Sequence, residues 1–273
     1  MDLKLTAHTA LVSGSTAGIG LAIATALAQE GANVIINGRT TERVDGAIAK
    51  RCCEAQIAQI KQTVTDAKLQ GVVADLGTFA GTEELFEQVP EVDILVNNLG
   101  IYGSKAFEEI SDDEWMKFLE VNVISGVRLS RHYLPLMLKK NWGRIIFISS
   151  ESALNIPAEM IHYGITKTAQ LALARGLAET TVGTNVTVNS VLPGPTRSEG
   201  VEDFIQGLAK DQSITPEQVE KEFFEKTRPS SLIKRFATPE EVAALVAFVA
   251  SPKSSATNGA ALRVDGGVVR SIV

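Results

Sequence analysis

Seven short runs of apolar, β-prone residues recur along this 273-residue chain, and longer helix-type stretches separate them. The runs are continuously apolar instead of alternating, which is the pattern of parallel strands that are covered on both faces. Their bounds are Thr9–Ser13, Asn33–Asn37, Gly71–Asp75, Asp93–Asn97, Arg144–Ser149, Asn185–Leu192 and Ala260–Val264. The alternation predicts an α/β fold with a Rossmann-like, doubly wound parallel sheet of about seven strands and helices on both faces.

Helix-type stretches are expected between these runs, and in the first of them apolar residues recur on one helix face. Their bounds are Gly18–Gly31, Thr41–Lys68, Gly81–Gln88, Asp112–Lys139, Glu159–Thr180 and Pro239–Ala250. A polar segment at 196–230 follows the end of the sixth run, at the edge where open α/β sheets bind ligands. We therefore expect one domain over residues 1–273, with residues 196–230 inserted into it as a substrate lid.

The composition argues against several kinds of partner. The formal net charge of −6 disfavours nucleic acid and anionic membrane surfaces. The two cysteines, Cys52 and Cys53, are adjacent and suit reduced thiols better than a disulfide. The first residues lack a cleaved-leader pattern, and no apolar run approaches the ~20 residues that span a bilayer. We expect a cytoplasmic protein with no membrane partner and, since no histidine or cysteine group has ligand spacing, no metal.

A glycine-rich turn follows the first run and opens the first expected helix, with the sequence Gly14-Ser15-Thr16-Ala17-Gly18-Ile19-Gly20. Gly14 permits a tight turn, Gly18 permits close approach to a pyrophosphate, and Gly20 permits close packing of the helix on the sheet. Free N–H groups at the helix start, with the helix dipole, favour bound phosphate. The turn predicts a dinucleotide phosphate site, and a structural turn without a ligand is the alternative.

Arg39 stands just after the second run, where an acidic residue would bind the ribose 2′-hydroxyl and select NAD. Its guanidinium suits a 2′-phosphate instead, so we expect NADP(H) rather than NAD(H) as the cofactor. The alternative is a solvated arginine that stacks on adenine, with either cofactor accepted.

Tyr163 and Lys167 form a Tyr-x-x-x-Lys pair inside an expected helix. Positions i and i+4 share one helix face, and an ammonium near a phenol lowers the phenol pKa toward the working pH. Such a pair is commonly an ordinary surface pair. Ser150 at the end of the fifth run can hold a substrate oxygen, and Asn122 interrupts a long helix, where a kink or a bound water is expected.

Together these motifs resemble the short-chain dehydrogenase/reductase family, and most of all its 3-oxoacyl-thioester (acyl-carrier-protein) reductase-like members. The resemblance covers nearly the whole chain. It includes the glycine turn, Asp75, Asn97-Asn98-Leu99-Gly100, Asn122, Ser150, Tyr163, Lys167, Pro193-Gly194 and Val264-Asp265-Gly266-Gly267. Ala17 departs from the second basic residue that NADP-preferring relatives often carry, so the cofactor prediction rests on Arg39.

The resemblance implies a set of cofactor contacts. Asp75 binds the adenine amino group with the backbone of Leu76 beside it, and Asn98 and Gly100 line the adenosine ribose. Three residues after the sixth run cover the nicotinamide and leave its B face toward the substrate: Pro193, Gly194 and Thr196.

The resemblance also implies four catalytic roles. Ser150 positions the carbonyl, and Tyr163 donates or accepts the proton. Lys167 lowers the tyrosine pKa and grips the nicotinamide ribose. Asn122 holds the water of a proton relay from Lys167 to solvent.

The substrate pocket is expected to have mostly apolar, medium-sized walls under the 196–230 segment. The expected walls are Ile101, Tyr102, Leu154, Asn155, Met160 and His162. His162 is interpreted as a pocket wall or surface residue and not as a catalytic group. A 3-oxoacyl thioester, a ketone, a steroid-like alcohol or a sugar-derived polyol would all fit such a pocket.

The sequence therefore predicts an NAD(P)-dependent oxidoreductase that interconverts a carbonyl and a secondary alcohol of a small molecule. A non-catalytic NAD(P)-binding sensor or scaffold on the same fold is the alternative. An epimerase or dehydratase is disfavoured, because about 25 residues after Ala250 leave no room for a further substrate domain. By resemblance, the two long helices pair between subunits, so a homotetramer is expected, with a dimer as the second possibility.

Overall fold

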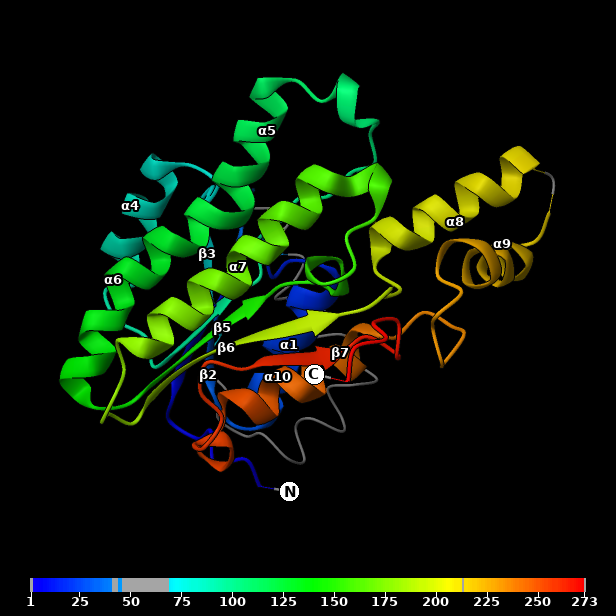
Figure 1. The fold of residues 1–273 in the computed structure, drawn as a ribbon. Coiled ribbons are helices and arrows are strands. Elements are labelled where there is room, and N and C mark those ends of the chain that lie inside the picture. The colour runs from blue at the N-terminus through cyan, green and yellow to red at the C-terminus, as the bar shows by residue number, and fades with distance from the viewer. Residues whose placement is uncertain (1, 41–43, 46–68, 213, 273) are drawn as a thin grey trace.

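In the described part of the chain, seven strands form one parallel sheet in the order β3-β2-β1-β4-β5-β6-β7 (Figure 1). The structure is a computed structural model that describes residues 2–40, 44–45, 69–212 and 214–272. The strands are β1 (Thr9–Val12), β2 (Asn33–Gly38), β3 (Leu69–Val73), β4 (Ile94–Asn97), β5 (Gly143–Ile148), β6 (Val186–Pro193) and β7 (Ala261–Val264). The predicted doubly wound parallel sheet is confirmed, because every neighbouring pair is parallel.

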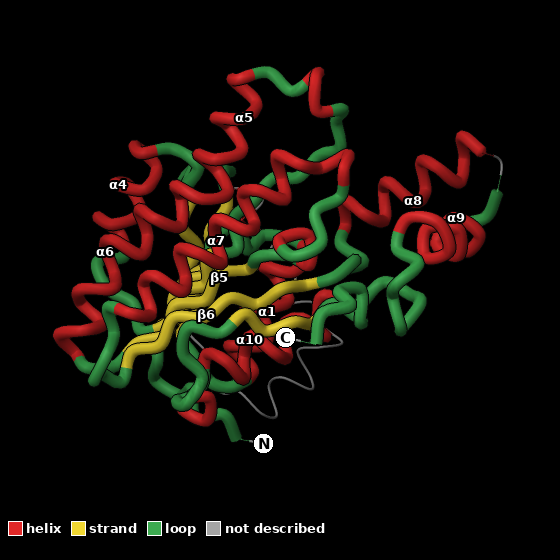
Figure 2. Tube along the Cα trace, in the orientation of Figure 1, coloured by secondary structure: helices red, strands yellow, loops and turns green. Residues whose placement is uncertain are grey.

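Helices cover both faces of the sheet (Figures 1 and 2). On one face, α1 (Gly18–Gln29) and α10 (Pro239–Ala250) pack together over a buried aliphatic core. The other face carries α4 (Phe79–Gln88), α6 (Ser125–Lys140) and α7 (Ile161–Glu179) over a second core. The helix expected at Thr41–Lys68, and with it Cys52 and Cys53, lies outside the described residues apart from Val44 and Asp45.

The long helix expected at Asp112–Lys139 is interrupted at Asn122. It consists of α5 (Asp112–Leu119), the π-helical turn η2 (Glu120–Ile124) and α6. A capping box between Ser111 and Glu114 fixes the start of α5. A π-helical turn inserts an extra residue into the helix, so that some backbone groups there do not form the regular α-helical hydrogen bonds. The expected disturbance at Asn122 therefore takes the form of a π-helical turn.

Residues 196–230 form a helical layer beyond the carboxyl ends of β5 and β6, toward which both strand arrows point (Figure 1). The layer contains α8 (Glu199–Gln212), α9 (Pro216–Glu222) and the π-helical turn η5 (Phe223–Thr227). Its apolar side chains, among them Ile205, Val219 and Phe224, form a small core with Phe236. The layer thus has a hydrophobic core separate from the two cores that flank the sheet.

Short 3-10 turns complete the fold: η1 (Phe107–Glu109), η3 (Glu151–Ala153), η4 (Ala158–Met160) and η6 (Pro252–Ser254). Two of them, η3 and η4, join the end of β5 to the start of α7 and so shape the chain between Ser150 and Tyr163. Among the helices of the described ranges, none is long and apolar enough to cross a bilayer.

Candidate active site

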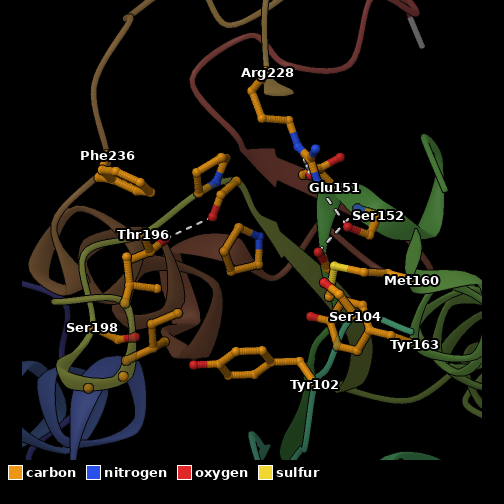
Figure 3. A pocket seen from close by; sticks show the side chains of 18 of the residues that line it. Tyr102, Ser104, Glu151, Ser152, Met160, Tyr163, Thr196, Ser198, Arg228 and Phe236 are labelled. Carbon is orange, nitrogen blue, oxygen red and sulfur yellow. Dashed lines mark hydrogen bonds and ion pairs between the residues drawn. The ribbon is translucent and has the colours of Figure 1, made fainter. Parts of the chain in front are cut away.

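A cavity of about 1200 Å³ opens at the carboxyl edge of the sheet. Its walls come from the glycine turn, from the chain after β4, β5 and β6, from α7, and from the 196–230 layer. Figure 3 shows Tyr163, Met160 and Ser152 on one side of this cavity and Thr196 and Phe236 on the opposite side. Because every strand of a parallel sheet ends at the same edge, residues far apart in the sequence meet here.

The glycine turn has the conformation that its sequence predicts. Gly14 and Gly18 have φ angles of +60° and +54°, in the left-handed region that side chains disfavour. At Gly20 a Cβ atom would lie 2.5 Å from both Asn98 Nδ2 and the Gly14 carbonyl oxygen. Gly20 therefore lets the first helical turn close against its own loop and against the end of β4.

Hydrogen bonds hold the turn to the neighbouring strand ends. Asn98 Nδ2 donates to the main-chain oxygens of Ser13 and Gly14, at 2.9 Å each. The Ser15 hydroxyl donates to the Val12 carbonyl at 2.7 Å, and Asn37 Oδ1 accepts from Gly14 N–H at 3.2 Å. Ser15 is fully buried, so its hydroxyl is committed to the loop. The sequence analysis did not identify Asn37 as a residue that holds the glycine turn. The feature that could have identified it is a polar residue near the end of a buried strand.

The N-terminus of α1 is open to an anion. Its N-cap residue, Ala17, provides no side-chain cap, and its first turn contains no acidic residue. By contrast, Thr or Ser side chains cap α4, α5, α9 and α10. Ala17, Gly18, Ile19 and Gly20 all line the cavity. Uncapped N–H groups and the positive end of the helix dipole fit the phosphates of a dinucleotide.

The residues expected around adenine lie along the same edge, outside the residues that line the cavity. Arg39 is exposed immediately after β2, and Thr16 packs its methyl group toward Gly38. Asp75 follows β3 and accepts a hydrogen bond from Gly77 N–H at 3.1 Å. The side chain of Leu76 is buried in the core, so its backbone is the part that a ligand can reach.

Ser150 and Tyr163 face the cavity together. Ser150 follows β5, and its Oγ accepts from Ser152 N–H at 3.1 Å, which caps η3. Tyr163 is in the first turns of α7. Burial raises the pKa of Tyr163 to about 12, although hydrogen bonding with Ser150 opposes this rise. The phenol is therefore protonated at neutral pH and is available as a proton donor.

Lys167 is buried one helical turn beyond Tyr163. Its Nζ donates to the Ile148 carbonyl at 2.9 Å and to Gln170 Oε1 at 3.3 Å, and lies 5.6 Å from the centre of the Tyr163 ring. Burial lowers the pKa of Lys167 to about 8. The structure differs here from the expected lowering of the tyrosine pKa, because the Lys167 ammonium is directed to these two oxygens and burial dominates at the phenol.

Asn122 clamps the loop after β4 to α7. Its Oδ1 accepts from Ile101 N–H at 2.7 Å, and its Nδ2 donates to the Ile101 carbonyl and to Thr166 Oγ1, at 2.9 Å each. Its main-chain oxygen accepts from Gln170 Nε2 at 2.6 Å. The Oδ1, the Nδ2 and the main-chain oxygen of Asn122 thus all have protein partners, and Gln170 was not identified from the sequence.

The comparisons with known proteins agree with this geometry. The family model described as enoyl-(acyl carrier protein) reductase matches residues 14–269. The uncharacterized oxidoreductase YvaG of Bacillus subtilis is 52% identical over 272 residues, with 100% of each chain covered. The 3-oxoacyl-[acyl-carrier-protein] reductase FabG of Aquifex aeolicus is 32% identical, with 98% of this chain and 100% of that one covered. The chain belongs to the short-chain dehydrogenase/reductase family.

A solved structure is similar over the entire length. L-Sorbose reductase from Gluconobacter frateurii, in complex with NADPH and L-sorbose, is 29% identical, with a TM-score of 0.89 and 100% of both chains covered. As a short-chain dehydrogenase/reductase, the protein is an NAD(P)-dependent oxidoreductase that transfers a hydride between a nicotinamide cofactor and a carbonyl or secondary alcohol.

Three of the six expected substrate-wall residues line the cavity of this reductase: Ile101, Tyr102 and Met160. Leu154 and Asn155 are exposed outside it, because the 3-10 turn η3 directs the following residues to the surface. His162 is 2% exposed and packs on Phe118 with ring centres 4.1 Å apart. Neighbouring residues of an α-helix point about 100° apart, so His162 faces away from the cavity that Tyr163 lines.

The cavity walls after β6 match the sequence expectation in position. Pro193, Gly194 and Thr196 line the cavity, and Thr196 Oγ1 donates to the Gly194 carbonyl at 2.9 Å. At Gly194 a Cβ atom would lie 2.5 Å from the Asp265 carbonyl oxygen, so the close approach of two chain segments requires glycine there. Gly100 lines the cavity opposite, beside Lys167 Nζ and Asn122 Oδ1.

An ion pair that the sequence did not predict joins the 196–230 layer to the catalytic loop. Arg228 Nε donates to Glu151 Oε1 at 3.0 Å, and both side chains are largely buried (Figure 3). Burial raises the pKa of Glu151 although Arg228 opposes it. Since Glu151 directly follows Ser150, the pair fixes the end of the layer beside the cavity.

In the described ranges, no group of three or more His, Cys, Asp or Glu residues could hold a metal.

Proposed function

We propose that this protein interconverts a small-molecule carbonyl and its alcohol with NADP(H), with Tyr163 as the proton donor and acceptor. The observation that carries the proposal is the meeting of Ser150, Tyr163 and the buried Lys167 in one cavity with the uncapped N-terminus of α1. A phosphate-binding helix end and a proton donor at one strand edge are what hydride transfer from a dinucleotide needs.

The glycine turn from Gly14 to Gly20 binds the cofactor phosphates through free N–H groups at the start of α1. Asp75 and the backbone of Leu76 bind the adenine, while Gly100 lines the adenosine ribose. The side chain of Asn98 holds the glycine turn and so shapes the ribose site indirectly. Pro193, Gly194 and Thr196 cover the nicotinamide. The bound cofactor supplies the hydride, and the chain supplies orientation and the proton.

Two side chains act on the substrate, and a third, Lys167, acts on Tyr163. The Ser150 hydroxyl donates a hydrogen bond to the carbonyl oxygen, and Tyr163 gives that oxygen its proton as the hydride arrives. With a pKa of about 12, Tyr163 keeps its proton until the oxygen becomes strongly basic. Lys167 Nζ lies 5.6 Å from the centre of the Tyr163 ring, where its positive charge would stabilise the phenolate, and it would hold the nicotinamide ribose of a bound cofactor.

The preference for NADP(H) rests on Arg39. Arg39 is exposed directly after β2, and a guanidinium at this position supports binding of a 2′-phosphate on the adenosine ribose. The structurally similar L-sorbose reductase, whose complex contains NADPH, supports the same preference.

Residues 196–230 act as the substrate lid of a single domain over residues 1–273. The lid contributes Thr196, Val201 and Phe223 to the cavity, and Arg228 ties its end to Glu151. Ile101, Tyr102 and Met160 form the substrate wall below it. The mixed wall suits a carbonyl on an apolar or moderately polar body, such as a 3-oxoacyl thioester, a simple ketone or a sugar-derived ketone.

The proposed assembly is a cytoplasmic homotetramer, in which the helices α5 to α7 pair between subunits. Large apolar side chains are exposed on each of these helices: Met116 is 63%, Leu136 39% and Ile165 41% exposed. Burial of such side chains between copies of the chain would remove apolar surface from water.

Tyr163→Phe is expected to lower kcat by roughly 10²–10⁴-fold, because it removes the proton donor. NADPH consumption would be followed against a panel of ketones and 3-oxoacyl thioesters, and cofactor binding by fluorescence titration. Tyr133→Phe is the matched control, since the Tyr133 hydroxyl donates to the Val89 carbonyl away from the cavity. Full turnover in Tyr163→Phe would contradict the assignment, and NADPH binding without turnover in the wild type would favour a sensor.

Arg39→Ala is expected to lower kcat/KM for NADPH by about 10- to 100-fold, the value of a charge-assisted hydrogen bond to phosphate, while kcat/KM for NADH stays unchanged. Steady-state kinetics with both cofactors measures this. Arg131→Ala, an exposed arginine on α6, is the control. If Arg39→Ala lost NADH use and kept NADPH use, the proposed cofactor preference would be wrong.

Light scattering at micromolar protein concentration tests the assembly. A mass of four chains is the expected result. A stable monomer would exclude the proposed pairing of α5 to α7, and two chains would indicate the dimer.

A further inference from the structure

Gln170 is a buried residue that connects Lys167 to Asn122. It lies three residues after Lys167 on α7 and is 1% exposed. Its Nε2 donates to the Asn122 main-chain oxygen at 2.6 Å, and its Oε1 accepts from Lys167 Nζ at 3.3 Å. The Gln170 side-chain amide thus joins the π-helical turn η2 to α7, the helix that contains Tyr163 and Lys167.

The two contacts fix the orientation of the amide. A main-chain carbonyl only accepts hydrogen bonds and an ammonium only donates them, so the NH₂ group must face Asn122 and the oxygen must face Lys167. The reversed amide would put two acceptors together and two donors together. The network therefore determines the orientation without ambiguity.

The amide also limits where the ammonium can point. Lys167 has three N–H donors, of which one binds the Ile148 carbonyl and one binds Gln170 Oε1. Gln170 is buried outside the cavity lining, whereas Ile148 belongs to the cavity wall. The third donor is left for the cavity side, where Tyr163 and Gly100 lie.

We propose that Gln170 is a positioning residue, which holds the Lys167 ammonium toward the cavity by bridging it to the Asn122 carbonyl. The proposal rests on the proposed function for its catalytic meaning. The Gln170 side-chain amide thus binds Asn122, the residue to which the family resemblance assigns a relay water. An amide holds its partners in place but does not pass protons as readily as water, so Gln170 acts through geometry and charge.

The surroundings make the Lys167 charge sensitive to this contact. Burial, which disfavours the ammonium, lowers the pKa of Lys167. The titratable groups that face this region are Tyr163 on α7, Glu151 on η3 and Tyr102 after β4, and the last two act on Tyr163. A single neutral acceptor beside a buried ammonium stabilises its charged form.

Two substitutions at Gln170 are expected to move the Lys167 pKa in opposite directions. Gln170→Leu removes the acceptor and is expected to lower this pKa by about one unit. Gln170→Glu keeps the size of the side chain, loses the donor to the Asn122 carbonyl and adds a negative charge, so it is expected to raise this pKa by about one unit. The signs differ because a lost acceptor destabilises the ammonium, whereas a nearby negative charge stabilises it.

Carbon-13 NMR of labelled lysine side chains measures this pKa directly in the protein without substrate. The Lys167 Cε resonance is assigned by its loss in Lys167→Arg. In parallel, the basic limb of the kcat/KM pH profile is expected to move in the same direction as the NMR midpoint for each variant. Thr181→Val is the control for destabilisation alone, since Thr181 is buried just after the C-terminal end of α7 and accepts a hydrogen bond from Asn258 Nδ2.

The outcomes separate the two proposals. Opposite shifts in Gln170→Leu and Gln170→Glu, with an unshifted Thr181→Val, support the positioning role, even if no carbonyl in the panel is reduced and the proposed function fails. An unshifted Lys167 midpoint in both Gln170 variants, with activity retained or only the melting temperature lowered, overturns it. If Gln170→Leu does not fold, Gln170→Met, which also removes the acceptor and keeps the length of the side chain, takes its place.

Discussion

Amide side chains hold the carboxyl edge of the sheet in shape, and the cavity depends on them. Asn98 binds the main-chain oxygens of Ser13 and Gly14, while Asn122 binds both main-chain groups of Ile101. Loops at a strand edge have backbone groups that no strand neighbour satisfies, and each would be costly to bury unpaired. Because an amide both donates and accepts, these residues satisfy such groups and fix the position of the loops together.

The electrostatics of the site follow from the burial of its titratable groups at this edge. Burial moves the pKa of Tyr163 up to about 12 and that of Lys167 down to about 8. Each shift disfavours the charged form of its group, as expected where water is removed. At neutral pH the phenol is therefore protonated and the ammonium is near its titration range, which suits proton donation to a developing alkoxide.

Much of the fold could be predicted from the sequence, because continuous apolar runs and helical periodicity are local signals. The glycine turn and the Tyr163–Lys167 spacing are local as well. The predictions that the structure does not match, and the contacts that the sequence did not reveal, depend on the three-dimensional arrangement of the chain. Leu154 and Asn155 point outward because a 3-10 turn follows Ser150, and His162 faces a different side of α7 from Tyr163. Gln170 binds Asn122, 48 residues away, and Arg228 binds Glu151, 77 residues away, so no local pattern reveals either pair.

The central claim is direct hydride transfer onto a carbonyl held at Ser150 and Tyr163. The most direct test uses NADPH deuterated at either the pro-S or the pro-R position of nicotinamide C4, with mass spectrometry of the alcohol product. The account predicts deuterium in the alcohol from the pro-S label and none from the pro-R label, because the proposed cover of Pro193, Gly194 and Thr196 over the nicotinamide would leave its B face toward the substrate. Transfer from the pro-R position, or an alcohol without deuterium from either label, would contradict it.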